Sequence, residues 1–212
     1  MQTGKKRSSL RDDFSTRVIV LIPIAIAINI AVGQIVSLLK LPVFLDSIGT
    51  VLVAIVAGPW AGALTGALAN IIWGVLTNPV SAFYAPVALL IGLSAGILAR
   101  FGFFQVWWKV VIAGIIIAFV AALSSAPITV GVFGGIYGGG TSLVVAYLEA
   151  TGKNVITSVL STSFLFEPLD KIVTCLVAWA ILKNLSVRYI SRFPRAYNIL
   201  PEQPVSAAES ES

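Results

Sequence analysis

Long apolar segments dominate the chain and leave little room for any other kind of structure. Six of them follow one another along the 212 residues, at about 18–39, 43–57, 60–76, 83–99, 106–130 and 168–182. Only 11% of the residues are charged, whereas about a quarter are charged in a typical soluble domain. So few charges cannot cover a water-facing surface of this size, and the first segment is long enough to cross a bilayer. We therefore expect an all-α, polytopic membrane protein with a six-helix transmembrane bundle.

The residue types that the sequence lacks exclude several functions. It contains no histidine and a single cysteine, Cys175. This rules out Ser–His or Cys–His catalysis, an intrachain disulfide and a histidine-ligated metal. It also contains no GxxxxGK(S/T) phosphate loop. We therefore expect no enzymatic activity, no cofactor and no metal site, and uphill transport would draw on an ion gradient or on partner subunits.

Basic residues gather near both ends of the chain and divide it into three parts. Residues 1–17 carry five of them, residues 18–184 form the expected membrane domain, and residues 185–212 form a C-terminal tail that ends in a stretch of disordered composition. Both clusters flank apolar runs, so they indicate contact with anionic lipid rather than with nucleic acid. In the six-helix topology, eleven of the 14 Lys and Arg residues fall on one side. The positive-inside rule makes that side, with both termini, cytoplasmic.

Small residues recur at four-residue spacing, a pattern that lets helices approach closely in lipid. Gly58, Gly62 and Gly66 form one such ladder, which begins at the Gly-Pro turn, and Gly92 and Gly96 repeat the spacing in the fourth segment. We expect the Gly58–Gly66 ladder to pack against other helices of the same chain. Ala27 and Ala31 repeat the spacing in the first helix. Spacing alone leaves open whether that face meets the same chain or a partner protein.

The connection between the fifth and sixth segments is long and has a partly helical pattern. Its five glycines between residues 134 and 140 cannot continue a rigid helix. Thr141 is suited to cap a short helix that runs through Glu149 and stops at Gly152, and a second helical piece is expected at about 154–164. Tyr137, inside the glycine stretch, is a candidate for stacking on a ligand. An ordered connection of this length is ordinarily functional.

Acidic residues near the membrane are the main candidates for ligand binding. Five of the nine acids lie in the terminal segments. The other four, together with one lysine, fall on the outer side of the expected topology: Asp46, Glu149, Glu167, Asp170 and Lys171. Ionisable groups inside a membrane are functional candidates by default. Asn78 adds a hydrogen-bonding group in the same half, although Asn78-Pro79 also predicts a turn.

Local helix structure offers another explanation for the same residues. Pro168 suits the first position of a helix, and Asp170 in the first turn would complement the helix dipole. Glu167 and Lys171 form a favourable i,i+4 pair if the helix begins earlier. Asp46, just before Ser47, is suited to cap the second helix. Ligand binding and helix capping therefore both stay open for this group.

Three stretches of the sequence resemble the substrate-binding S-components of energy-coupling factor (ECF) transporters, a type of ABC transporter: LDSIGTVLVAIVAGPWAGALTGALANII, FGGIYGGGTSLVVAYLEATGKN and EPLDKIVTCLVAWAI. The likeness covers about residues 18–183. It rests on the segment order, the Gly-Pro hairpin, the Asp-Lys start of the last helix and the two alanines of the first. It implies a six-helix bundle in a prokaryotic cell membrane that binds a vitamin or similar micronutrient at its outer face.

The resemblance also implies partners. In the family, a module of one membrane coupling protein and two ATPases tilts the bundle so that the site faces the cytoplasm. Ala27 and Ala31 map onto the family's docking surface, and Asp170 and Lys171 resemble ligand contacts in some members. A stand-alone membrane carrier and a membrane sensor or scaffold domain are the alternative functions. The sequence shows neither an inverted repeat nor an attached signalling domain to favour them.

Overall fold

The structure, a computed structural model, describes residues 13–138 and 140–200, and this part of the chain is helical without any β-strand. The elements are α1 (Thr16–Leu38), α2 (Ile48–Ala57), α3 (Pro59–Leu76), α4 (Pro79–Phe83), α5 (Ala85–Arg100), α6 (Trp107–Gly131), α7 (Gly140–Ala150), α8 (Val155–Asn184), α9 (Val187–Ile190) and the 3-10 turn η2 (Ala196–Asn198). The all-α prediction is confirmed for these residues. Three helices, α1, α3 and α6, are long and apolar enough to cross a membrane, which indicates a membrane-associated protein.

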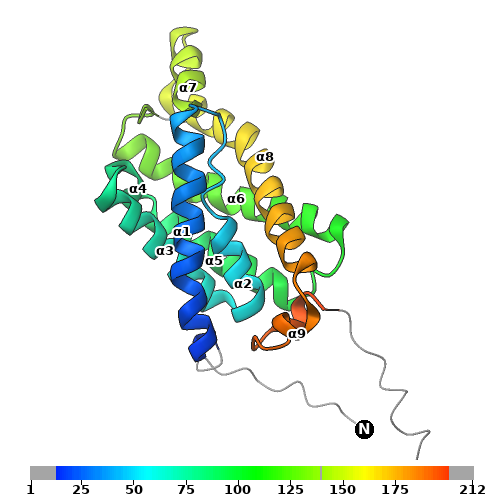
Figure 1. The fold of residues 1–212 in the computed structure, drawn as a ribbon. Coiled ribbons are helices and arrows are strands. Elements are labelled where there is room, and N and C mark those ends of the chain that lie inside the picture. Colours follow the sequence, from blue (N-terminus) through cyan, green and yellow to red (C-terminus); the bar gives the residue numbers. More distant parts are fainter. Residues whose placement is uncertain (1–12, 139, 201–212) are drawn as a thin grey trace, which may run out of the picture.

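Both ends of the described chain lie at the same end of the bundle, and α7 lies at the opposite end (Figure 1). Arg17 on α1 donates a hydrogen bond from Nη1 to the carbonyl oxygen of Arg192, over 2.8 Å. Arg100, at the end of α5, lies 3.9 Å from the carboxylate of Asp13. We call this end the basal end, and the other the α7 end.

Helix α2 is the shortest of the helices that form the core, and every one of its residues is buried. At 1.5 Å of rise per residue, its ten residues extend over about 15 Å. A bilayer core is about 30 Å thick, so α2 is only about half as long as a helix that crosses it. The helix ends at Gly58, whose φ of +117° is open to glycine but strained for other residues. Pro59 then starts α3 without a connecting loop.

Polar contacts with α1 hold the first turn of α2 in place. Asn29 on α1, only 1% exposed, donates from Nδ2 to the Thr50 hydroxyl over 2.8 Å. Its Oδ1 accepts the backbone N–H of Gly49 over 2.7 Å. A Cβ at Gly49 would lie 2.2 Å from the carbonyl oxygen of Ala25, so the two helix backbones are in direct contact. The Asn29 amide therefore satisfies a backbone donor that the start of a helix leaves free.

The last carbonyl groups of α2 are satisfied by residues from the far end of the sequence. The backbone N–H of Arg195 donates to Val56 over 3.1 Å, and its Nε donates to Ala57 over 3.0 Å. Asn198 donates to Ile55 over 2.7 Å. Buried Arg195 also forms an ion pair with Asp13. Residues 185–200 thus pack against the bundle, whereas the predicted disordered stretch and most of the basic N-terminal segment lie outside the described residues.

The glycine ladders pack α3 against α5, which confirms the expected contact within the chain. A Cβ at Gly92 would lie 2.4 Å from the carbonyl oxygen of Gly62, and one at Gly66 would lie 2.5 Å from that of Ala88. A Cβ at Gly96 would lie 2.3 Å from the Cα of Pro59. Since no side chain fits at these contacts, the two helices are as close as backbones allow.

Helix α8 differs from the sequence-based expectation. It runs without interruption from residue 155 to 184, so the separate piece expected at 154–164 is its first part. Pro168 lies inside the helix and not at its start, which corrects the predicted first position. The helix begins instead at Val155, and Asn154 caps it, because its side chain accepts the backbone N–H of Thr157 over 2.8 Å. Thr141 lies within α7 and does not cap it.

Gly92 offers a direct test of the close packing between α3 and α5. The added Cβ of G92A collides with backbone, so we expect a loss of about 1–3 kcal/mol of folding free energy, as in overpacked cores. Gly131 at the end of α6 is the matched control, because a Cβ there meets no described atom within 4 Å. Thermal unfolding in detergent should show a lower midpoint for G92A and an unchanged or higher one for G131A. Equal midpoints for the two variants would contradict the packing.

Candidate functional site

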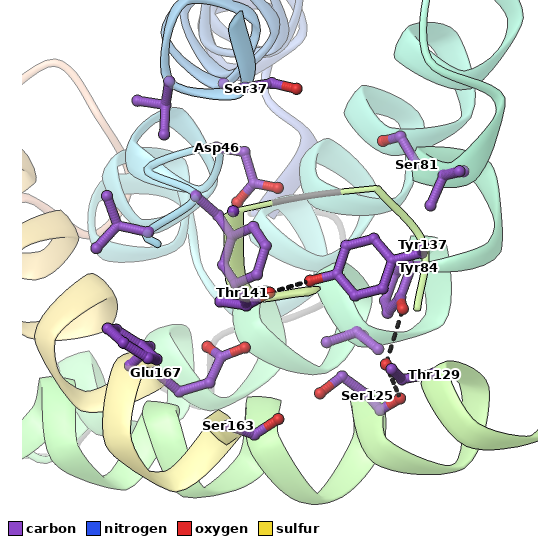
Figure 2. Close-up of a pocket in the computed structure, with 18 of the residues that line it drawn as sticks. Ser37, Asp46, Ser81, Tyr84, Ser125, Thr129, Tyr137, Thr141, Ser163 and Glu167 are labelled. Atoms are coloured by element: carbon purple, nitrogen blue, oxygen red, sulfur yellow. Dashed lines mark hydrogen bonds between the residues drawn. The ribbon is translucent and has the colours of Figure 1, made fainter. Parts of the chain in front are cut away.

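A cavity of about 190 Å³ lies toward the α7 end, next to the first turn of α2. Its walls come from α1, α3, α4, α5, α6, α7 and α8, and from the connections at 41–47 and 137–138. Figure 2 shows side chains from these elements pointing toward one another. The polar and aromatic lining consists of Ser37, Phe44, Asp46, Ser47, Asn70, Trp73, Asn78, Ser81, Tyr84, Ser125, Thr129, Tyr137, Thr141, Thr162, Ser163, Phe166, Glu167 and Lys171. Pockets for drug-sized ligands measure about 300–1,000 Å³, so this cavity suits a smaller molecule.

The short length of α2 creates this space. The connection between α1 and α2 is not helical, and it forms part of the cavity wall. A longer α2 would occupy this space. Leu45 in this connection has a φ of +50°, which is unusual for a bulky residue. Non-helical backbone at membrane depth persists only where it faces protein or a cavity. The backbone groups of this connection therefore need partners within the protein.

Asp170 on α8 supplies those partners. Its Oδ1 accepts the backbone N–H groups of Phe44 and Leu45, over 2.8 and 2.7 Å. Its other oxygen pairs with the ammonium group of the adjacent Lys171. Asp170 is completely buried and is absent from the cavity lining. Its carboxylate therefore shapes the cavity wall from behind by fixing the connection that contains Leu45.

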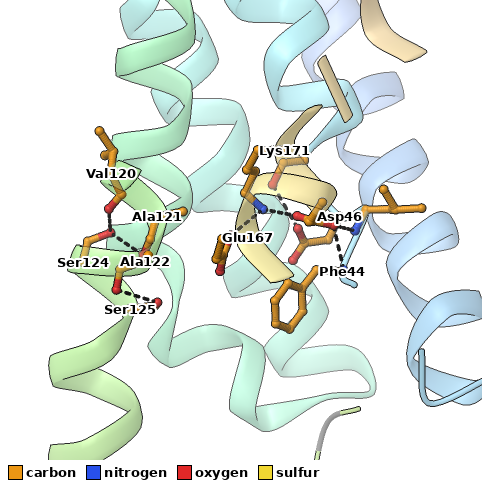
Figure 3. A network of polar contacts seen from close by, with 12 residues as sticks. Phe44, Asp46, Val120, Ala121, Ala122, Ser124, Ser125, Glu167 and Lys171 are labelled. Carbon is orange, nitrogen blue, oxygen red and sulfur yellow. Dashed lines mark hydrogen bonds and ion pairs between the residues drawn. The ribbon is translucent and has the colours of Figure 1, made fainter. Parts of the chain in front are cut away.

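Lys171 joins the carboxylates around this end of the cavity (Figure 3). Besides its pair with Asp170, its Nζ lies 3.4 Å from Oε2 of Glu167 and 5.8 Å from the ring centre of Phe44. Half-buried Asp46 accepts a hydrogen bond from the Ser47 hydroxyl over 2.9 Å. One ammonium group thus faces three carboxylates.

Three buried polar atoms in the cavity wall have no hydrogen-bond partner among the described residues. They are Oγ of Ser81, Oγ1 of Thr162 and Oε2 of Glu167. The Glu167 oxygen is within ion-pair distance of Lys171 but lacks the geometry of a hydrogen bond. Buried polar groups are nearly always hydrogen-bonded in folded proteins. The wall of this cavity therefore contains three polar groups that no described residue satisfies.

Aromatic rings form the opposite part of the wall and are fixed by their own polar groups. The Tyr84 hydroxyl bonds with that of Thr129 over 2.8 Å, and the Tyr137 hydroxyl bonds with that of Thr141 over 2.6 Å. The two tyrosine rings lie 5.8 Å apart, centre to centre. The indole N–H of Trp73 donates to Gln34 over 2.8 Å. These bonds hold the rings in place, so that they form a rigid apolar wall for a ligand.

The structure brings most of the sequence-predicted site residues to this cavity. Asp46, Asn78, Tyr137, Glu167 and Lys171 line it. Asp46 does not cap α2 as predicted. Ser47 occupies the cap position, and its side chain makes no cap bond. The ligand-binding role of the five lining residues stays a prediction.

Two predicted residues lie outside the cavity wall. Asp170 stands behind it, as described above, and Glu149 lies on α7 beside Gly135, away from the lining. A Cβ at Gly135 would lie 3.0 Å from Oε1 of Glu149. Direct ligand contact is therefore not the role that the structure assigns to either carboxylate.

Sequence reasoning missed the hydroxyl and aromatic groups that complete the wall. Thr162, Ser163 and Phe166 line the cavity from one face of α8, one turn before Glu167. Their spacing of three and four residues is the signal that could have revealed this face. A helix start at Pro168 hides this face, because it separates these residues from Glu167. Tyr84, between α4 and α5, also lines the cavity.

Comparisons with protein-family models, with curated proteins and with solved structures gave no match for this chain. The geometry and charge of the cavity carry the functional interpretation.

Proposed function

We propose that this chain is the substrate-capture subunit of an ECF-type importer, and that the cavity takes up a vitamin or related micronutrient from outside a prokaryotic cell. The observation that carries the proposal is the cavity with three unsatisfied polar atoms in its wall. A small molecule with hydrogen-bonding groups would satisfy them. The proposal gives the chain a binding role and no chemical reaction.

The distribution of basic residues supports an orientation in which the cavity opens outward. Those at the basal end include Arg17, Arg100, Lys183, Arg192 and Arg195. Lys40 and Lys153 follow the ends of α1 and α7 on the other side. By the positive-inside rule, the basal end and both termini are cytoplasmic. The six spans would then be α1, α2, α3, α5, α6 and α8, with α2 and α5 as the short apolar members.

An exposed face of α1 supports docking of a membrane partner. Ala27 and Ala31 are both exposed, one turn apart. Ile24 and Ile35 continue the face and are 54% and 59% exposed. Small residues in such a face allow another helix to approach closely in lipid. In the proposed function this partner is the membrane coupling protein, and two ATPases bound to it supply the energy.

A bulky side chain in the cavity tests the capture function. Ser163 lines the cavity, whereas Ser161 on the same helix is exposed. We expect native mass spectrometry of the purified full-length protein to detect a bound small molecule in the wild type and in S161W. The S163W variant should lose it, because the indole occupies the cavity. Retention of the same molecule by S163W would contradict the site.

Docking through α1 can be separated from ligand capture. Leucine at both Ala27 and Ala31 adds bulk to the proposed contact surface but lies away from the cavity. We expect cells with the double variant to lose uptake of the co-purifying molecule, while the purified protein still binds it. L123W adds comparable bulk to an exposed position of α6 and should leave uptake near the wild-type level. Wild-type uptake by the double variant would rule out this docking surface.

A further inference from the structure

The charge around the cavity is unbalanced. Asp170 and Lys171 satisfy each other, and Asp170 also holds two backbone N–H groups. Asp46 and Glu167 remain on the cavity side, and Lys171 is the only Lys or Arg among the described lining residues. Three carboxylates against one ammonium group leave a formal charge of minus two. A buried excess of this kind is costly unless another positive group balances it.

Glu167 is directed at the empty space and is incompletely satisfied. The side chain is buried, with 6% of the residue exposed, and its Oε2 lacks a hydrogen-bond partner among the described residues. Figure 2 shows its carboxylate and that of Asp46 reaching into the same cavity from different elements. Asp46 has only the neighbouring Ser47 hydroxyl as a side-chain donor. Two acceptors in one cavity call for a ligand that brings donors and positive charge.

The apolar part of the wall also suits a cation. Aromatic ring faces attract positive groups, with the strongest effect where water is excluded. Phe44 already lies near the Lys171 ammonium group, and Tyr84, Tyr137 and Trp73 face the same space. The tyrosine hydroxyls bond to threonines, so the rings are the part of these side chains left to contact a ligand.

We propose that the cavity selects a small organic cation. Its charged nitrogen donates hydrogen bonds to Glu167 and Asp46, and its flat apolar part lies against the rings of Tyr84 and Tyr137. The inference rests on the proposed capture function and adds the charge class of the ligand. A metal ion is a poorer occupant, because the described residues contain no cluster of three or more His, Cys, Asp or Glu that could hold one.

Three flat probes of nearly equal shape and different charge test the inference: benzamidinium, benzamide and benzoate. Each is added at millimolar concentration to the purified full-length protein in detergent, freed of co-purifying ligand, and the thermal midpoint is measured. We expect benzamidinium to raise the midpoint, benzamide to raise it less, and benzoate to leave it unchanged. Equal or greater stabilisation by benzamide or benzoate would overturn the charge selectivity, and so would the absence of any effect from benzamidinium.

Matched variants locate the effect in the cavity. E167Q keeps the shape of the side chain and removes its charge, and we expect benzamidinium to bind it at least about tenfold more weakly. D46N, in the connection between α1 and α2, removes the second carboxylate, and its affinity for benzamidinium provides the test if E167Q folds poorly. E149Q removes a carboxylate outside the lining and should bind like the wild type. Wild-type affinity in both E167Q and D46N would overturn the inference, whereas loss of the co-purifying molecule in S163W would still support the capture site.

Discussion

The short, fully buried helix α2 is the constraint on which the rest of the structure depends. It is about half as long as a bilayer core is thick, and it reaches the basal end but not the α7 end. Asn29 holds its first turn, and Arg195 and Asn198 satisfy its last carbonyl groups. Because both ends are fixed, the helix cannot slide along the bundle to close the space beyond it. The cavity lies in the space that a longer α2 would occupy.

The polar groups beside the cavity divide into two roles. Asp170 is used internally, because its carboxylate holds Lys171 and the backbone of the connection from α1 to α2. The other two carboxylates, Glu167 and Asp46, face the cavity. Charged groups are expensive within a membrane and are retained where they serve a function. The proposed capture function therefore depends on the two carboxylates that face this cavity.

Much of this arrangement follows from the sequence, and the exceptions have physical reasons. Apolar runs located the main helices, and glycine spacing indicated close packing within the chain, since both signals are local; which helices meet at these glycines came from the structure. The start of α8 was misplaced because proline is favoured at the first position of a helix and disfavoured inside one, yet Pro168 lies in its interior. The cap on α2 was missed because Arg195 contacts Ala57, which lies 138 residues earlier in the chain. The hydroxyl groups around Glu167 were missed because a helix start at Pro168 separates Thr162 and Ser163 from Glu167, whereas in the continuous helix they share one face.

An experimental density map of the full-length protein, isolated from its own membrane without added ligand, tests the central claim most directly. We expect density for a small molecule in the cavity beside the first turn of α2, in contact with Glu167 and Asp46 and bounded by the rings of Tyr84 and Tyr137. A cavity closed by side chains, or a bound small molecule at another place in the bundle, would contradict the assignment of this space as the capture site.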